Sequence, residues 1–322
     1  MQVSAIVNRL TASAKPTSQS LPAARPVGGN DASMTAQYVR LVLFVIVVVL
    51  AVSILFTINR DDGFESSISD YFHTPARFAF VSSMFAIGVC LMVLYSSVRL
   101  ENVLLNIAGA LAPIVGFAAT TQATGKKPPT GFDVITSQVD TFAEQTLPAY
   151  FLALVLFAFC VLRVHTENRV RIFLRTFASV CVLAGLTWLC WNEHLGWLLP
   201  GRRSVHTLAA IGFFVPLIAL VFLTARSSGR KPPERVTGPY KPFYYALSAL
   251  MFVAGLFLLL DKTVIELEEE HDWPYSVFIV EAVLIACFAA FWLAEFLRVQ
   301  KLATTCPQQD VRPLTDGAAV EA

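Results

Sequence analysis

The sequence has little charge and few polar stretches. Only 15% of its 322 residues are charged and 56% are hydrophobic, whereas roughly 45–50% is usual for soluble globular domains. The charged residues gather between long uncharged runs, which is the pattern expected where a hydrocarbon layer excludes charge. The composition therefore excludes a soluble globular fold and favours a chain embedded in a bilayer.

A set of cysteines that could form an extracellular disulfide framework is also missing. Five of the six cysteines lie inside apolar runs, and the sixth, Cys306, lies near the C-terminal end. We interpret them as small apolar core residues. The first 38 residues lack the apolar segment of a signal peptide and carry no acid before Asp31. Residues 1–38 are predicted to be a disordered cytoplasmic arm, with a mitochondrial transit peptide as the alternative.

The uncharged runs are long enough to cross a membrane. A helix needs about 20 residues to span about 30 Å of hydrocarbon, and only the fourth and fifth runs are clearly shorter. The runs cover residues 41–58, 78–98, 103–120, 148–162, 176–191, 205–225, 243–260 and 274–297. They predict an all-α, polytopic transmembrane bundle of about eight spans over residues 39–298. Residues 299–322 are predicted to be a disordered cytoplasmic tail.

Lysine and arginine fall unequally on the two sides of these runs. One set of alternating segments contains 17 of the 24 basic residues, and the opposite set contains 7. Because basic residues are retained in the cytoplasm, the first set is predicted to be cytoplasmic. The outer loops carry fourteen acids. The expected location is a bacterial inner membrane with both termini in the cytoplasm, and the alternative is the mitochondrial inner membrane.

Glu281 is the polar residue that stands out at membrane depth. By helical rise it lies about 10 Å below the outer interface, where an ionisable group is costly and is a functional candidate by default. Ser82 and Ser83 lie at a similar depth and are candidate partners. The alternatives are a structural hydrogen bond inside the bundle or a helix that begins later than expected.

Histidines lie mainly on the predicted outer side, beside carboxylates. The outer histidines are His73, His194, His206 and His271. Histidine and carboxylate are ligands of zinc, and a zinc ion with an open position can generate hydroxide. Histidines that only face solvent are the alternative, since no two are within one helical turn. His206 opens the sixth run beside Arg202 and Arg203, where it could also bind a lipid phosphate.

The stretch SISDYFHTPARFAFVSSMFAIG, residues 67–88, predicts a polar segment followed by a helix. Pro75 is suited to the first turn and Thr74 is a candidate N-cap. Arg77 is predicted to extend towards the outer headgroups.

This stretch resembles a family of bacterial multipass membrane proteins with the pattern SIS-x-Tyr-Tyr-x-Thr-Pro-x-Arg and an Ala-Ile-Gly in the next helix. Phe72 stands here in place of the second tyrosine. Further patches that look similar are NIAG at 106–109, the SVH that ends at His206, and residues 278–281 before a Trp-Leu that begins at Trp292. The resemblance implies a common fold and no known activity.

A weaker resemblance concerns Ser69 and His73. Their Ser-x-x-x-His spacing is similar to that of the alkaline ceramidases and the progestin and adiponectin receptors, a superfamily with seven helices and a zinc ion near one membrane face. Those proteins also carry an aspartate one helix later and a late His-x-x-x-His. Here the aspartate is missing, and His206 is followed four residues later by Ala210.

The leading hypothesis is a membrane protein that binds a lipid or small amphiphile in an outer-facing polar cavity. The candidate binding residues are Glu281, His206, Arg77, Asp70, Ser82 and Ser83. One alternative is a metal-dependent lipid hydrolase with zinc on His73, His206 and Glu281, and another is a proton-coupled transporter centred on Glu281. Membrane lipids are expected as partners, whereas nucleic acid and a resident cofactor are not. The oligomeric state and any enzymatic activity are left open.

Overall fold

A computed structural model of the chain describes residues 29–61, 64–117, 149–150, 152–156, 203–226, 235–264 and 275–305. The chain divides into two compact units, residues 1–35 and residues 36–322. In the first unit the description covers residues 29–35, which are helical. The fifth apolar run and the greater part of both predicted tails lie outside the described residues. Residues 149–150 and 152–156 of the fourth run are helical.

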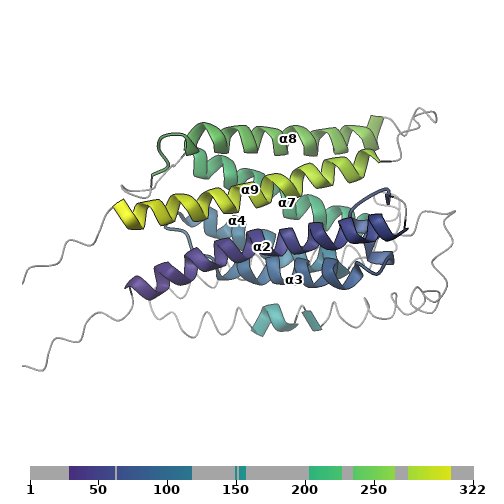
Figure 1. Cartoon of the computed structure of the whole chain (residues 1–322), viewed down its shortest axis with the longest axis horizontal. Coiled ribbons are helices and arrows are strands. Elements are labelled where there is room, and N and C mark those ends of the chain that lie inside the picture. The colour runs from purple at the N-terminus through teal and green to yellow at the C-terminus, as the bar shows by residue number, and fades with distance from the viewer. Residues whose placement is uncertain are drawn as a thin grey trace, which may run out of the picture. The chain divides into compact units, whose positions relative to one another are not determined.

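The described elements are helical throughout, with no strand among these residues. They are α2 (Gly29–Asp61), η1 (Ser69–His73), α3 (Arg77–Val93), α4 (Arg99–Phe117), α7 (Arg203–Arg226), α8 (Tyr240–Val264) and α9 (Ser276–Thr305) (Figure 1). Five of them, α2, α4, α7, α8 and α9, are long and apolar enough to cross a membrane, and α3 is a shorter apolar helix. The all-α prediction is confirmed for the described residues, and the five helices indicate an integral membrane protein.

The helices extend beyond the apolar runs that predict them. α2 begins at Gly29, inside the segment expected to be a disordered arm, and α9 continues to Thr305, inside the expected tail. By contrast, α3 ends at Val93, before its apolar run does. The side-chain amide of Asn102 bonds both the N–H and the carbonyl of Ser96, each at 2.6 Å. This double contact stabilises the turn between α3 and α4.

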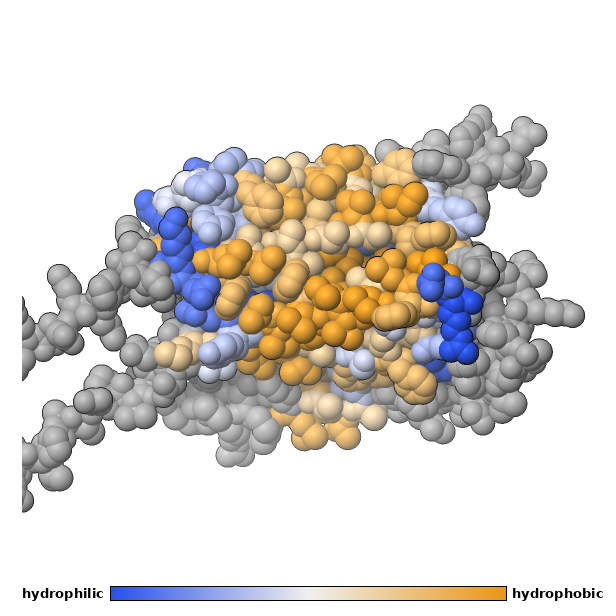
Figure 2. All heavy atoms as spheres, in the orientation of Figure 1, coloured by the Kyte–Doolittle hydropathy of each residue, from blue (hydrophilic) through white to orange (hydrophobic). Residues whose placement is uncertain are grey.

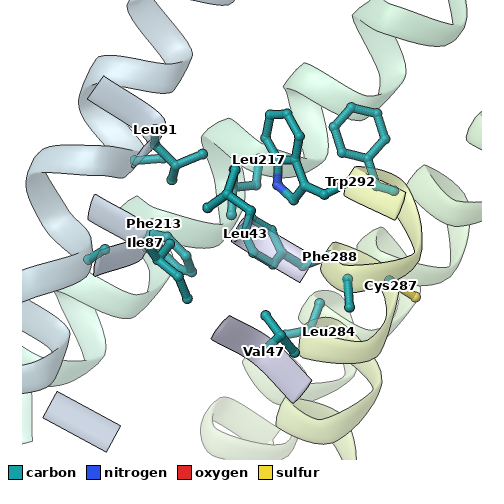
Figure 3. Packing of buried hydrophobic residues seen from close by; sticks show 14 of the residues in the cluster. Leu43, Val47, Ile87, Leu91, Phe213, Leu217, Leu284, Cys287, Phe288 and Trp292 are labelled. Atoms are coloured by element: carbon teal, nitrogen blue, oxygen red, sulfur yellow. The ribbon is translucent and has the colours of Figure 1, made fainter. Parts of the chain in front are cut away.

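Neighbouring helices pack in chain order, α3 on α4, α4 on α7, α7 on α8 and α8 on α9, and α9 also contacts α7. α2 contributes one buried stripe to the same core. Its members recur at helical spacing of three or four residues: Leu43, Val47, Leu50 and Ile54. Figure 3 shows Leu43 and Val47 directed towards Leu217 of α7 and towards Leu284 and Phe288 of α9.

The outside of this bundle carries an apolar surface. Figure 2 shows hydrophobic side chains across the middle of the visible face and hydrophilic residues at both ends. On α2 the exposed residues include Val45, Val49 and Phe56, which face away from the buried stripe. Exposed apolar side chains of this size are stable in contact with lipid, so the surface agrees with a membrane-embedded bundle.

Glycines permit a close crossing between α3 and α4. A Cβ atom added to Gly88 would lie 2.6 Å from the carbonyl oxygen of Gly109 and 2.8 Å from Cδ of Pro113. A Cβ atom added to Gly109 would lie 2.8 Å from the carbonyl oxygen of Gly88. The two backbones therefore touch, as small residues allow in membrane helix pairs. Gly88 and Gly109 are the glycines of the Ala-Ile-Gly and NIAG patches.

Candidate functional site

The segment that joins α2 to α3, residues 64–76, is called the α2–α3 linker here. It folds into a turn of 3-10 helix before the chain enters α3. The N–H of Asp70 donates to the carbonyl of Ser67, and the N–H of Tyr71 donates to the carbonyl of Ile68. The hydroxyl of Ser67 also accepts from the N–H of Asp70, at 3.1 Å. These local bonds give the linker a defined backbone that can present side chains to its neighbours.

Thr74 ends this turn. Its hydroxyl donates to the carbonyl of Tyr71 at 2.8 Å and accepts from the N–H of Ala76 at 3.2 Å. α3 begins at Arg77, after Ala76, with no side-chain cap. The prediction that Thr74 caps α3 is therefore wrong, because its hydroxyl closes the preceding turn instead.

Three side chains from distant parts of the chain meet at the linker, and we call this group the Glu281 site. It consists of Ser69 in the linker, His206 in α7, Glu281 in α9 and the backbone N–H of Ile68. The N–H of Ile68 donates to Oε2 of Glu281 at 2.6 Å. Oγ of Ser69 lies 2.8 Å from Nε2 of His206 and donates to Oε1 of Glu281 at 3.3 Å. The structure thus brings together the two residues that the sequence ranks highest, Glu281 and His206.

Two of the three side chains of the Glu281 site are buried. Ser69 and His206 are each 5% exposed, and Glu281 is partly buried. The N–H of Phe278, in the first turn of α9, donates to the carbonyl of Ser66 at 3.1 Å. Such an N–H has no partner within its own helix, so this bond fastens the linker to the beginning of α9.

The hydroxyl of Ser69 can connect His206 and Glu281 in either direction. It has one proton, so it donates to only one of the two at a time. While it donates to Glu281, its oxygen can accept from a protonated Nε2 of His206. While it donates to His206, its oxygen can accept from a protonated Glu281. The arrangement is a short hydrogen-bonded chain that is suited to moving a proton or to holding three elements together.

Other predicted site residues contact the linker itself. The carboxylate of Asp70 accepts from the hydroxyl of Ser66. The guanidinium of Arg77 lies over the ring of Phe72, with Cζ 4.2 Å from the centroid, in cation–π geometry. The ring of His73 meets the same Phe72 edge-on, with centroids 5.4 Å apart. Phe72, the residue that replaces the second tyrosine of the family pattern, therefore contacts both of these basic side chains.

The two serines of α3 differ in position. Ser82 is exposed, and its hydroxyl donates to the carbonyls of Phe78 and Ala79 in its own helix, at 2.6 and 3.3 Å. The structure does not bring Ser82 to the Glu281 site. Ser83 is buried on α3. The two serines differ because successive helical residues point about 100° apart.

The zinc hypothesis requires His73, His206 and Glu281 in one place. Ser69 joins the last two, whereas the ring of His73 packs on Phe72. Within the part of the chain that the structure describes, no group of three or more His, Cys, Asp or Glu side chains is placed to hold a metal ion. His194 and His271 lie outside the described residues.

A groove of about 540 Å³ lies where α2 meets the end of the linker. Its volume is within the range of small-molecule sites, roughly 300–1,000 Å³. Most of the described residues that line it are on one side of α2, and the others are Pro75 and Ala76. The α2 residues that line it are Val48, Val49, Val52, Ser53, Phe56, Thr57 and Arg60. Neither Glu281 nor His206 lines this groove.

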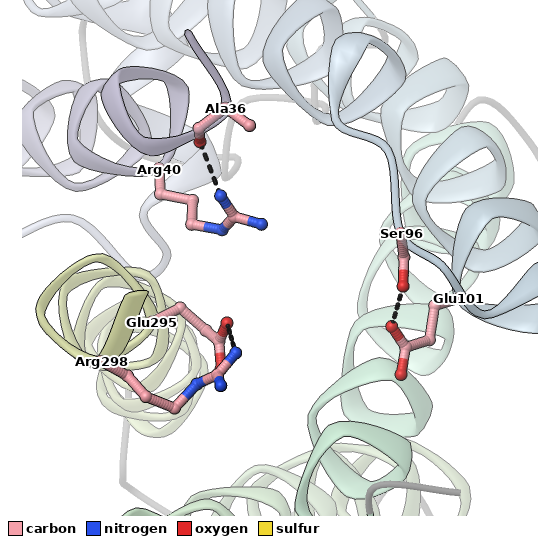
Figure 4. A network of polar contacts seen from close by, with 6 residues as sticks. All are labelled: Ala36, Arg40, Ser96, Glu101, Glu295 and Arg298. Atoms are coloured by element: carbon pink, nitrogen blue, oxygen red, sulfur yellow. Dashed lines mark hydrogen bonds and ion pairs between the residues drawn. The ribbon is translucent and has the colours of Figure 1, made fainter. Parts of the chain in front are cut away.

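A second polar group, the Arg298 cluster, lies at the other end of the helices, and consists of Arg40, Glu101, Glu295 and Arg298. Glu295 is fourteen residues beyond Glu281 on α9, or about 21 Å along the axis. The guanidinium of Arg298 forms two bonds with the Glu295 carboxylate, both of 2.9 Å. Figure 4 shows Arg40, Glu101 and Arg298 pointing inward from three different helices.

Three of the four members of the Arg298 cluster are deeply buried. Glu101 is 1% exposed, Glu295 4% and Arg298 6%. Glu101 accepts from the hydroxyl of Ser96, and Arg40 donates to the carbonyl of Ala36 at 2.9 Å. A bidentate carboxylate–guanidinium pair is the favourable form of such a buried contact.

Three features of these sites are not predicted from the sequence. Ser69 is central to the Glu281 site, but the sequence pointed to it only through its spacing to His73. Arg60 is one of the seven basic residues on the predicted outer side, and nothing in the sequence indicates a groove beside it, because a groove depends on how side chains pack. Glu295 and Arg298 stand three residues apart with opposite charge, and this spacing on a helix was a signal for an ion pair.

Comparisons with protein-family models, with curated proteins and with solved structures found no match to this chain.

Proposed function

We propose that this integral membrane protein binds a lipid or small amphiphile at its Glu281 end. The observation that carries the proposal is the double role of the α2–α3 linker. One part of the linker, at Ile68 and Ser69, bonds to Glu281 and His206. The other part, at Pro75 and Ala76, forms a wall of the apolar groove on α2.

The Glu281 site then acts mainly by fixing the shape of the groove. Its bonds hold the linker against α7 and α9, and the turn closed by Thr74 carries that restraint to Ala76. A wall that is already in place lowers the entropic cost of ordering the protein around a ligand. Loss of the Glu281 contacts is therefore expected to weaken ligand binding without removing a group that touches the ligand.

We also propose about eight spans, with both termini in the cytoplasm of a bacterial inner membrane. The described helices give support for an even number of crossings in the segment between α4 and α7. A Cβ atom added to Gly116, at the end of α4, would lie 3.7 Å from Cα of Val81 in the first half of α3, and His206, at the beginning of α7, lies in the Glu281 site. Because the end of α4 and the beginning of α7 both lie towards the Glu281 end, we propose that the chain crosses the membrane an even number of times between them. Two further crossings would bring the six apolar helices to eight.

Ligand binding can be tested with a substitution that fills the groove. Val52 lines the groove and Val45 is exposed on α2 outside it, so Val52→Trp and Val45→Trp form a matched pair. Full-length protein would be purified in mild detergent, and copurified lipid or other amphiphile would be measured by mass spectrometry. We expect Val52→Trp to lose the bound molecule and Val45→Trp to keep it. Equal occupancy in both variants and in the wild type would contradict the proposal.

Proton-coupled transport centred on Glu281 is a second candidate. The observation that favours it is the chain from His206 through Ser69 to Glu281, which can pass a proton in either direction. In sealed vesicles, Glu281→Gln should abolish pH-driven uptake while the protein stays folded. Uptake that survives this substitution would contradict the transport proposal. The proposal that a ligand binds in the groove would still stand.

A further inference from the structure

The groove on α2 has a polarity that points to one class of ligand. Its α2 residues recur every three or four positions, so they form a continuous stripe along the helix. Arg60 is eleven residues beyond Val49 along the stripe, a helical rise of about 16 Å. Half of a hydrocarbon layer about 30 Å thick is about 15 Å. The groove is therefore as long as one leaflet is deep.

Among the described residues that line the groove, charge occurs at one end only. Arg60 is the charged member of this wall, and it lies at the last position of the stripe. Val48, Val49, Val52 and Phe56 offer apolar contact along the remainder. The hydroxyl of Thr57 donates to the carbonyl of Ser53 at 3.0 Å, so it is already bonded within α2. The wall is apolar at membrane depth and cationic at the membrane surface.

We propose that the groove binds one glycerophospholipid of the leaflet on the Glu281 side, with an acyl chain along the valine stripe and its phosphate on Arg60. This inference rests on the proposed function, because it names the lipid that the groove would hold. An arginine guanidinium matches the geometry and charge of a phosphate group. An apolar chain of leaflet length matches the remainder of the groove.

The test compares a phospholipid with a lipid that lacks phosphate. Delipidated full-length protein would be titrated with phosphatidylglycerol or with diacylglycerol of the same acyl chains, and bound lipid would be counted by native mass spectrometry. A basic residue near a membrane surface contributes about 1 kcal/mol, which corresponds to about a fivefold change in affinity. Arg60→Gln should therefore weaken phosphatidylglycerol binding about fivefold and leave the weaker diacylglycerol binding unchanged. Arg60→Lys should retain most of the affinity.

Lys241→Gln is the matched control, since it removes one exposed positive charge at the beginning of α8. This variant should bind phosphatidylglycerol like the wild type. If Arg60→Gln binds as well as the wild type while Val52→Trp does not bind, the phosphate inference is overturned and the proposed function stands. If Val52→Trp also binds fully, both are overturned. If Lys241→Gln loses as much affinity as Arg60→Gln, the effect is general attraction to charge, and the proposed role of Arg60 is wrong.

Discussion

The crossing of α3 and α4 gives a prediction that depends on a single methyl group. In Gly88→Ala the new Cβ would lie 2.6 Å from the carbonyl oxygen of Gly109 and 2.8 Å from the ring of Pro113. Real Cβ atoms essentially never approach this closely, and neither a backbone carbonyl nor a proline ring is a flexible neighbour. Overpacking of this kind costs about 1–3 kcal/mol. We therefore expect Gly88→Ala to be destabilised by that amount, although alanine is the better helix former.

Gly255→Ala is the matched control, because it is the same change inside another membrane helix. A Cβ atom there would meet Cδ1 of Ile218 at 3.9 Å, an ordinary contact. This variant should equal the wild type or exceed it by up to about 1 kcal/mol. Purified proteins would be compared in one detergent by the temperature at which half of each sample leaves the monodisperse peak. A Gly88→Ala protein that melts with or above Gly255→Ala would refute the close approach.

Three further predictions follow from the polar sites. Ser69→Ala should destabilise the fold by about 1–3 kcal/mol, because two buried polar partners lose their hydrogen bond, and a thermal midpoint equal to that of the wild type would contradict the site. Glu295→Ala should cost about 3–5 kcal/mol, because it leaves the buried Arg298 without its ion-pair partner. The double change to Glu295→Leu and Arg298→Met should restore part of that loss in the same assay. Metal analysis after mild purification should give less than one zinc per chain, and a full equivalent that disappears in His73→Ala and His206→Ala would instead establish the hydrolase alternative.

The helices could be predicted from the sequence because hydrocarbon excludes charge over a fixed thickness. Each described α-helix overlaps an expected apolar run, and the ends differ where local bonds decide, as at Asn102 and Thr74. Glu281 could be selected because a polar group is costly at membrane depth. His206 could be selected because it opens an apolar run at the edge of that region. Ser82 and Ser83 could not be told apart in this way, because their burial depends on which face of α3 meets α4.

The partners within the Glu281 site could not be predicted from spacing. A 3-10 turn sets the direction of Ser69, and the position of α9 decides that Glu281 meets the N–H of Ile68. The patches that resemble the bacterial membrane family acquire a physical explanation from these contacts. SIS supplies Ile68 and Ser69, SVH supplies His206, and the run at residues 278–281 supplies Glu281.

The α2–α3 linker also connects the Glu281 site to the lipid-facing surface. The shape of the groove therefore depends on residues that do not line it. Because Ala76 follows the turn that Thr74 closes, a change at Glu281 alters the groove only by loosening the linker. Glu281→Leu is therefore expected to weaken lipid binding in proportion to its loss of thermal stability. A variant with Val52→Trp should lose binding at unchanged stability. If Glu281→Leu abolished binding while the melting temperature stayed constant, the carboxyl would contact the ligand itself, and the groove on α2 would be the wrong site.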